Sequence, residues 1–117
     1  MRYLLLIYTP EKEQAKMTPA QQQDMMDGYN KFTEDLMGAK AMLGGDALQP
    51  TTTATTVRVR GGKTATTDGP FAETKEQLGG FYLVEAKNLD AAVKWAAKIP
   101  GAKHGAIEVR PIMDFAH

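Results

Sequence analysis

Residues 2–8 read RYLLLIY. In an extended strand successive side chains point to opposite faces, so this run would be apolar on both faces rather than on one. A strand of this kind lies inside a sheet that is covered on both sides. Residues 81–85, which read FYLVE, have the same two-faced character. The chain therefore predicts two central strands, at 2–8 and at 81–85.

A helix is predicted over residues 19–38. It begins with TPAQ at 18–21, where the threonine caps the helix, the proline takes its first position and the glutamine completes a capping box. The apolar residues that follow are spaced four, three and four apart, as on one stripe of a helix: Met25, Tyr29, Phe32 and Leu36. Gly38 is the expected end of this helix.

A second helix is predicted after Asn88, because asparagine is a favoured N-cap residue. Pro100-Gly101 ends it. Its expected inward stripe consists of Leu89, Val93 and Ala96, with Ala92 and Ile99 beside it.

The remaining strands are shorter. Residues 41–48 predict a weak strand with a bulge or a close backbone approach at Gly44-Gly45. Residues 106–112 predict the last strand, with Ile107 and Val109 facing inward.

A hairpin is predicted from residues 55–60 and 63–67, which turn at Gly61-Gly62. A two-residue turn sets the register of the two strands. The expected cross-strand pairs are Arg60 with Lys63 and Val59 with Thr64.

The order of these elements is a βαβ–βαβ pattern with the hairpin inserted between its halves. It predicts one domain, 1–117, with a ferredoxin-like α+β sandwich in which both helices cover one sheet face. The other face, apolar in both central strands, then needs a cover. A second copy packed sheet to sheet, as in dimeric α/β barrels, is the simplest cover and predicts a homodimer. Loops that cover this face in a monomer are the alternative.

The composition excludes several classes of protein. The 117 residues contain 14 Lys and Arg against 14 Asp and Glu, whereas nucleic-acid binding needs a basic surplus. The chain has no cysteine, which excludes disulfides and thiolate chemistry. The first apolar run is too short and too soon charged for a signal peptide, and no run approaches the ~20 apolar residues of a membrane span. We therefore expect a cytoplasmic protein that binds neither nucleic acid nor membrane.

No cofactor is expected, and no structural metal. The two histidines, His104 and His117, are far apart in the chain and lack a ligand-spaced carboxylate cluster.

The candidate site is the segment DGPFAETKEQLGG at residues 68–80, a loop rich in charge and glycine between two strands. Asp68-Gly69-Pro70 predicts a tight turn. Asp68 either caps the backbone of this turn or is an exposed acid or base at the mouth of a pocket. Phe71 is expected to anchor the loop on the core. Gly79-Gly80 would let a ligand or another backbone approach closely.

The charged residues of this loop have two interpretations. Glu73, Lys75 and Glu76 form either a solvated surface or an acid/base set beside Asp68. His104, in the turn before the last strand, is either solvated or a proton donor.

The basic residues of the hairpin and of the last strand also have two interpretations each. Arg110 either binds an anion or pairs with a nearby acid such as Glu108. Arg58, Arg60 and Lys63 make the hairpin basic, either to meet an acidic partner or to protect an edge strand from aggregation.

The chain resembles the YCII-related family, in its DGPF-domain branch, over essentially its whole length. The resemblance rests on residues 3–8, 45–50, 55–58, 68–81 and 104–111. It implies a ferredoxin-like fold and a dimer.

What the resemblance implies about activity is limited. Proteins of this branch are mostly uncharacterised, and their genes often neighbour extracytoplasmic-function sigma factors. The wider group includes a His–Asp pair and a dehydrochlorinase-like enzyme. In that group the histidine lies near the start of the first helix, and residues 18–27 contain none here, so the pair is not carried over.

The first functional hypothesis is a small-molecule pocket between the sheet and the loop, with cofactor-free acid/base chemistry of a lyase, isomerase or dehalogenase kind. Asp68 or Glu73 would be the base and His104 the proton donor. The expected ligand-binding residues are Gly69, Pro70, Phe71, Lys75, Gly79, Gly80 and Arg110.

The second hypothesis is a non-enzymatic module that binds a metabolite or a protein and is linked to sigma-factor stress regulation. Convergence of the charged residues on one enclosed cavity would favour the enzyme, and their dispersal over an open surface would favour the binding module. A third option is that the loop only fastens the dimer.

Overall fold

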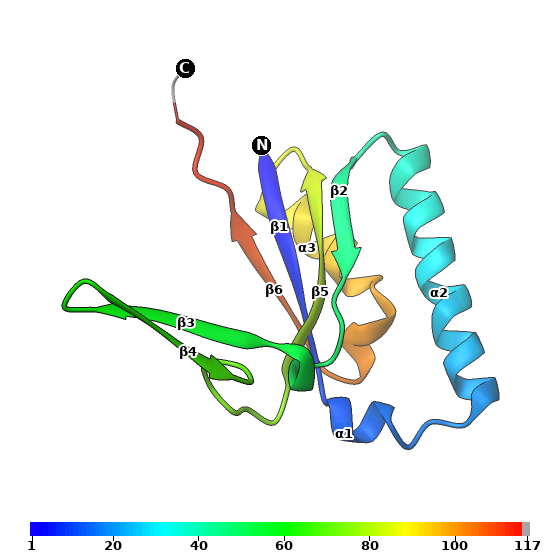
Figure 1. The fold of residues 1–117 in the computed structure, drawn as a ribbon. Coiled ribbons are helices and arrows are strands. Elements are labelled where there is room, and N and C mark those ends of the chain that lie inside the picture. Colours follow the sequence, from blue (N-terminus) through cyan, green and yellow to red (C-terminus); the bar gives the residue numbers. More distant parts are fainter. Residues whose placement is uncertain (116–117) are drawn as a thin grey trace.

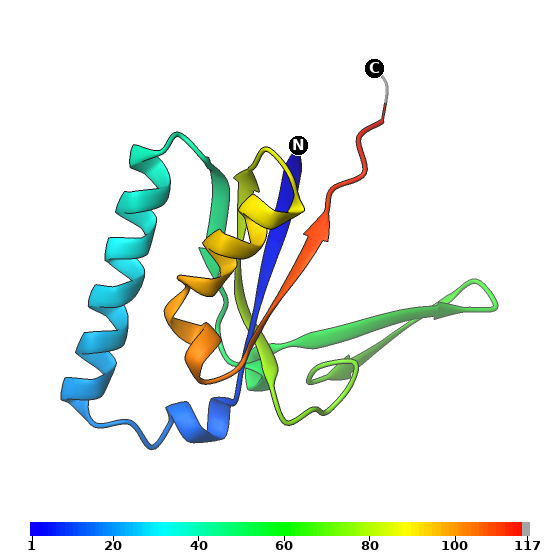
Figure 2. The ribbon, with the colours of Figure 1, turned by 180° about the vertical axis from the view of Figure 1, so that it is seen from behind.

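The computed structural model describes residues 1–115, so His117 lies outside the described residues. Four strands form an antiparallel sheet in the order β2-β5-β1-β6. The strands of this sheet are β1 (Arg2–Thr9), β2 (Met42–Ala47), β5 (Gln77–Glu85) and β6 (Ala106–Pro111). Helices α2 (Pro19–Gly38) and α3 (Leu89–Ala97) both cover one face of it (Figures 1 and 2). The predicted ferredoxin-like α+β fold is confirmed.

A second sheet holds only two strands, β3 (Thr55–Arg60) and β4 (Lys63–Asp68). The predicted hairpin and its register are confirmed, with Arg60 opposite Lys63. Three short helical turns had no signal in the sequence: α1 (Glu11–Gln14), η1 (Thr51–Thr53) and η2 (Pro100–Lys103).

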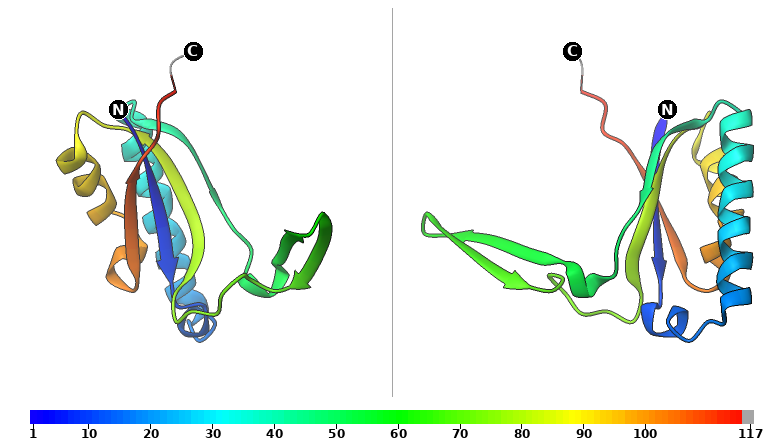
Figure 3. Two further views of the ribbon diagram at one scale, coloured as in Figure 1. Left: turned by 90° about the vertical axis from the view of Figure 1, so that its left-hand side faces the viewer. Right: turned by 45° about the vertical axis from the view of Figure 1, so that its right-hand side comes forward.

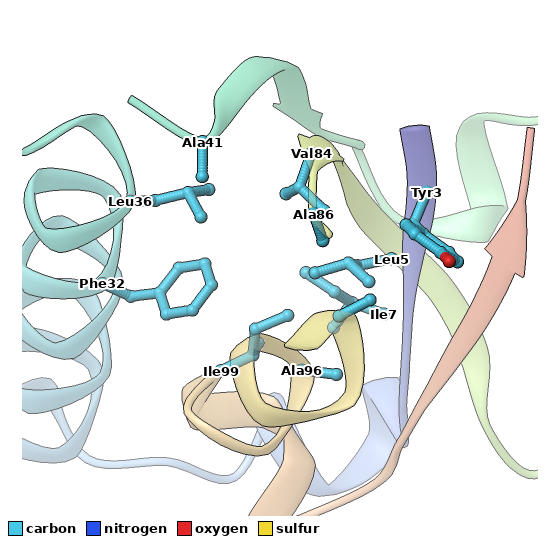
Figure 4. Close-up of a cluster of buried hydrophobic side chains, with 11 residues drawn as sticks. Tyr3, Leu5, Ile7, Phe32, Leu36, Ala41, Val84, Ala86, Ala96 and Ile99 are labelled. Carbon is cyan, nitrogen blue, oxygen red and sulfur yellow. The ribbon is translucent and has the colours of Figure 1, made fainter. Parts of the chain in front are cut away.

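The core lies between the sheet and the two helices. Along β1 the burial alternates strictly, and the odd-numbered residues from Tyr3 to Thr9 are the buried ones. Leu5 meets Val84 of β5, Leu36 of α2 and Ile99 in one cluster (Figure 4). This burial accounts for one of the two apolar faces of the central strands.

The other apolar face carries no helix, and we call it the helix-free face. Register places the even-numbered residues of β1 beside Phe81 and Leu83 of β5 on this face. Its larger apolar members on β1 and β5 are Leu4, Leu6, Tyr8, Leu78, Phe81 and Leu83, all half-buried and all outside the core cluster.

Helix α2 begins as its sequence predicts. The Thr18 hydroxyl accepts a hydrogen bond from the Gln21 amide, and the Gln21 side chain accepts one from the Thr18 amide, which is the expected capping box. The helix ends at Gly38, and the left-handed residue after it is Lys40, with φ of 57°.

The inward face of α3 differs from the prediction. Ala92 and Ala96 are buried, whereas Leu89 and Val93 are 51% and 48% exposed. Helix α3 approaches β6 with Cα separations within 8 Å, and a methyl side chain fits this spacing where a larger one would not.

Strand β5 begins at Gln77, four residues before the predicted start. Gly79 and Gly80 therefore lie within the strand and not in the preceding loop. The predicted irregularity of β2 is confirmed as a register shift between Met42 and Gly44.

No helix within residues 1–115 is both long enough and apolar enough to cross a membrane.

Candidate functional site

A cavity of about 500 Å³ lies between α2 and the end of the sheet where β2 meets β5. The helix-facing positions at this end hold almost no side chain. Gly80 pairs with the buried Ile7 on one side and with Ala47 on the other, and Gly45 is the next helix-facing residue of β2. Glycine and alanine at these positions leave space that a larger residue would fill. The cavity is thus a direct consequence of the sequence.

One wall of the cavity is made of hydroxyl groups. Tyr29 and Thr33 come from successive turns of α2, and Tyr82 comes from β5. The Thr33 and Tyr82 hydroxyls form a hydrogen bond of 2.9 Å. Phe32 holds the Tyr82 ring edge to face, with ring centroids 5.0 Å apart. These contacts fix two donors and acceptors on a rigid helix–strand pair.

Tyr29 remains a neutral hydroxyl over a wide pH range. Burial raises the pKa of Tyr29 above the usual tyrosine value, the Gly101 amide acts in the opposite direction by donating a hydrogen bond, and Tyr82 adds to the rise. The Tyr29 hydroxyl also lies close to Gly101, since a Cβ at that glycine would come within 2.7 Å of it. Tyr29 can therefore donate a hydrogen bond to a ligand at neutral pH.

We expect the raised pKa of Tyr29 to cost stability in alkali. Above the pKa of tyrosine in the unfolded chain, the unfolded state loses this proton while the folded state keeps it, so the free energy of unfolding falls as pH rises. Urea unfolding of wild type and Tyr29→Phe between about pH 8 and pH 11 measures the effect. The variant should lose less stability over this range, and parallel curves would contradict the expectation.

A carboxylate is fixed at the mouth of the cavity. The Glu11 carboxylate accepts hydrogen bonds from the Thr51 amide at 2.9 Å and from the Thr51 hydroxyl at 2.7 Å. The Glu11 amide donates to the Gln77 side chain at 2.9 Å, and the Gln14 side chain donates to the Thr9 hydroxyl at 3.0 Å. This network joins α1, η1 and the start of β5, so it holds the mouth of the cavity in shape.

The charged residues that line the cavity are all acidic. Its described lining includes the acidic residues Glu11 and Asp46 and no lysine, arginine or histidine. A ligand with a phosphate or carboxylate would meet no cation there and would lie near the Glu11 carboxylate, since Asp46 pairs with Phe81 and its side chain points to the helix-free face.

A larger, more open groove of about 1010 Å³ runs between α2 and the α3–η2 segment. His104 lines this groove, with acids and a lysine of α2 on one side and Lys98 and Lys103 on the other. The groove is a separate space from the cavity, which has Tyr29 and Thr33 in its wall.

The structure brings only two of the predicted site residues to the cavity, Gly79 and Gly80. Asp68, Glu73 and Lys75 are exposed and line neither the cavity nor the groove. Gly69 and Pro70 are likewise absent from both linings.

The apolar character of Phe71 predicts that it anchors the loop on the core, but the structure shows no such anchor. Its side chain is 81% exposed. The turn is held instead by the Gly69 amide, which donates to the Ala54 carbonyl at 2.7 Å, and by the Thr56 hydroxyl, which donates to the Gly69 carbonyl at 2.8 Å. The loop is therefore tied down through its backbone.

Arg110 pairs with Glu108 at 3.9 Å on the same strand, and both side chains are exposed. An exposed pair of this kind contributes little to stability, about 0–1 kcal/mol. Within residues 1–115, no group of three or more potential metal ligands is found.

Sequence reasoning missed the hydroxyl wall and Glu11. Tyr29 belongs to the apolar stripe of α2, which is typical of a packed side chain, and Thr33 lies four residues further on the same side of the helix. The sequence signal for the cavity was the set of small residues at 45, 47 and 80. Where such residues lie beside one another on paired strands, they leave space that larger side chains would fill.

The chain matches the YCII-related domain over residues 1–116. It is similar to an uncharacterised protein of Rhizobium meliloti (strain 1021), with 36% identity over 114 residues, which cover 96% of this chain and 92% of that protein. This protein belongs to the YCII-related family.

Proposed function

We propose that this protein is a homodimeric binding protein for a small uncharged or cationic molecule. The observation that carries this proposal is the cavity beside Gly80, with its hydroxyl wall and its acidic mouth. A small number of fixed polar groups around an otherwise apolar space is typical of ligand sites.

Binding is favoured over acid/base catalysis by the positions of the charged residues. The proposed base, Asp68 or Glu73, and the proposed proton donor, His104, share neither of the two cavities. Proton transfer requires such groups within hydrogen-bond reach of one substrate. The hydroxyls of Tyr29, Thr33 and Tyr82 do share one space, where they can orient a ligand.

The homodimer is supported by the exposed area of the chain. The chain exposes 8581 Å², whereas a compact monomer of its mass exposes about 6,300 Å². A standard protein interface buries only about 800 Å² on each partner, so the excess is enough for a stable dimer. The helix-free face, which is apolar and lies on the central strands, is the surface that we propose is covered.

Three aromatic probes of nearly the same shape test the charge preference of the cavity. Benzamidine is a cation, benzamide is neutral and benzoate is an anion. Because the Glu11 carboxylate lies at the mouth and no cation lines the cavity, we expect chemical shifts of backbone amides around the cavity to respond to benzamidine and benzamide and not to benzoate. The measurement is an NMR titration of the isotopically labelled dimer.

Glu11→Gln sharpens this test, since glutamine still accepts the hydrogen bond from the Thr51 amide but has no charge. Benzamidine should then bind about 3- to 10-fold more weakly, while benzamide is unaffected. Glu85→Gln, an exposed acid that does not line the cavity, is the matched control. Equal affinity for benzoate and benzamidine in the wild type would overturn the proposed ligand class.

A further inference from the structure

The hairpin of β3 and β4 stands free of the rest of the molecule, and we call residues 55–67 the arm. Every residue of the arm is exposed except Thr56, which is half-buried. Val57 and Val59 are 58% and 57% exposed. A lone two-stranded hairpin is marginally stable in water, so this arm lacks the packing that would hold it.

The arm extends on the side of the sheet opposite the helices. Both views of Figure 3 show it leaving the base of the sheet at a steep angle, on the side of the helix-free face. The radius of gyration is 16.3 Å, against about 13 Å for a compact chain of this length. The arm and the helix-free face thus border the same space, one on each side of it. A partner molecule that covers the helix-free face therefore also contacts the arm.

The two sides of the arm differ in character. From the register, Val57 lies opposite Thr66 and Val59 opposite Thr64, which makes one side apolar and β-branched. The other side contains all of the arm's charged residues: Arg58, Arg60 and Lys63. The valine side is suited to packing and the basic side to water.

The charge of the arm is complementary to the rest of the same chain. The arm, residues 55–67, holds three of the 14 basic residues and none of the acidic ones, and the acid of the hairpin is Asp68, the last residue of β4. The remainder therefore holds 11 basic residues against 14 acidic ones. The body of a second copy is therefore net acidic, which favours the approach of the basic arm, while the valine side of the arm makes the apolar contact.

We propose that in the homodimer each arm reaches around the partner subunit and packs its valine side, Val57 and Val59, against it. This inference rests on the proposed homodimer. Two-fold symmetry makes it self-consistent, because the contact that covers one arm also covers the other. The arm is then an assembly element whose order depends on the dimer.

Hydrogen exchange of the arm amides tests this directly. In the wild-type dimer, residues 55–67 should exchange at least about 100-fold more slowly than in a monomeric form, because packing suppresses the local opening of the hairpin. The monomeric form is Leu6→Arg, which places a charge at the centre of the helix-free face and leaves the arm unchanged.

Two double variants on the arm give a matched comparison. Val57→Ser with Val59→Ser should raise the dimer dissociation constant by about 100-fold or more, because four buried valines per dimer are lost. Ala65→Ser with Thr67→Ser, on the basic side, should leave it within about 3-fold of the wild type.

The outcomes separate the two proposals. A wild-type dimer whose arm is protected and whose affinity depends on the valines supports the inference. A wild-type dimer whose arm exchanges freely, or whose affinity ignores the valines, overturns the inference and leaves the homodimer standing. A wild type that sediments at the chain mass of 12.8 kDa overturns both.

Discussion

Leu6→Arg is expected to convert the protein from a dimer of twice the 12.8 kDa chain mass into a folded monomer. Leu6 lies in the centre of a row across the helix-free face, with Phe81 on one side and Glu108 on the other. In the dimer, two arginines and the neighbouring Glu108 side chains would lose their hydration, and the desolvation cost of a buried ion pair can exceed its Coulombic gain. In the monomer, the new side chain stays in water beside Glu108. Sedimentation velocity at about 100 µM resolves the two masses.

The control for this experiment is Val93→Arg, which places the same charge on an exposed valine of α3. It lies on the opposite side of the sheet and should leave the mass at that of the dimer. Circular dichroism shows whether each variant keeps its helices. A dimeric Leu6→Arg would place the interface elsewhere, and the helix-free face would then need another explanation.

The architecture was predictable because local and global signals agree. The capping box at Thr18, the spacing along α2 and the two-faced strands each point to the same sandwich. The excess exposed area was not predictable, since it depends on where the arm points. Nothing in residues 55–67 determines whether the hairpin folds back on the sheet or leaves it.

The inward face of α3 shows a limit of hydrophobic patterning. Leu89 and Val93 are the larger apolar residues, so patterning places them inside. Ala92 and Ala96 are inside because the helix lies close to β6, and that distance is a property of the assembled sheet. Periodicity identifies a helix reliably, whereas the buried side depends on the packing distance.

The predicted loop site and the cavity lie at the same end of β5, but their polar groups differ. Gly79 and Gly80 do line the cavity, and the small residue at 80 helps to create it. The polar groups of the cavity are hydroxyls of α2 and β5 together with Glu11 and Gln14 of α1, not the charges of the loop at 68–76. Tyrosine is found both inside proteins and at their surface, and threonine is mostly exposed, so the sequence alone offers no reason to select these residues.

Gly105→Ala is expected to cause the largest loss of stability of any single methyl addition in the described chain. Gly105 lies in the turn between η2 and β6, and a Cβ there would overlap the carbonyl oxygen of Tyr8. The same Cβ would lie 2.9 Å from the Glu76 carboxylate and from the Cα of Thr9. Both Tyr8 and Thr9 belong to the central strand β1, so the backbone cannot yield without moving the sheet. We expect a loss of about 3 kcal/mol or more in the free energy of unfolding.

Gly38→Ala is the matched control, since it adds the same methyl group at the end of α2 where no atom lies within 4 Å. It should raise the free energy of unfolding by about 0.5–1 kcal/mol, because alanine loses less backbone entropy than glycine in a helix. Urea unfolding of both variants measures two changes of opposite sign. If Gly105→Ala were neutral, the turn before β6 would have to relax without disturbing β1. The close packing of residues 8, 9, 76 and 105 would then not be what joins the loop at 68–76 to the turn before β6.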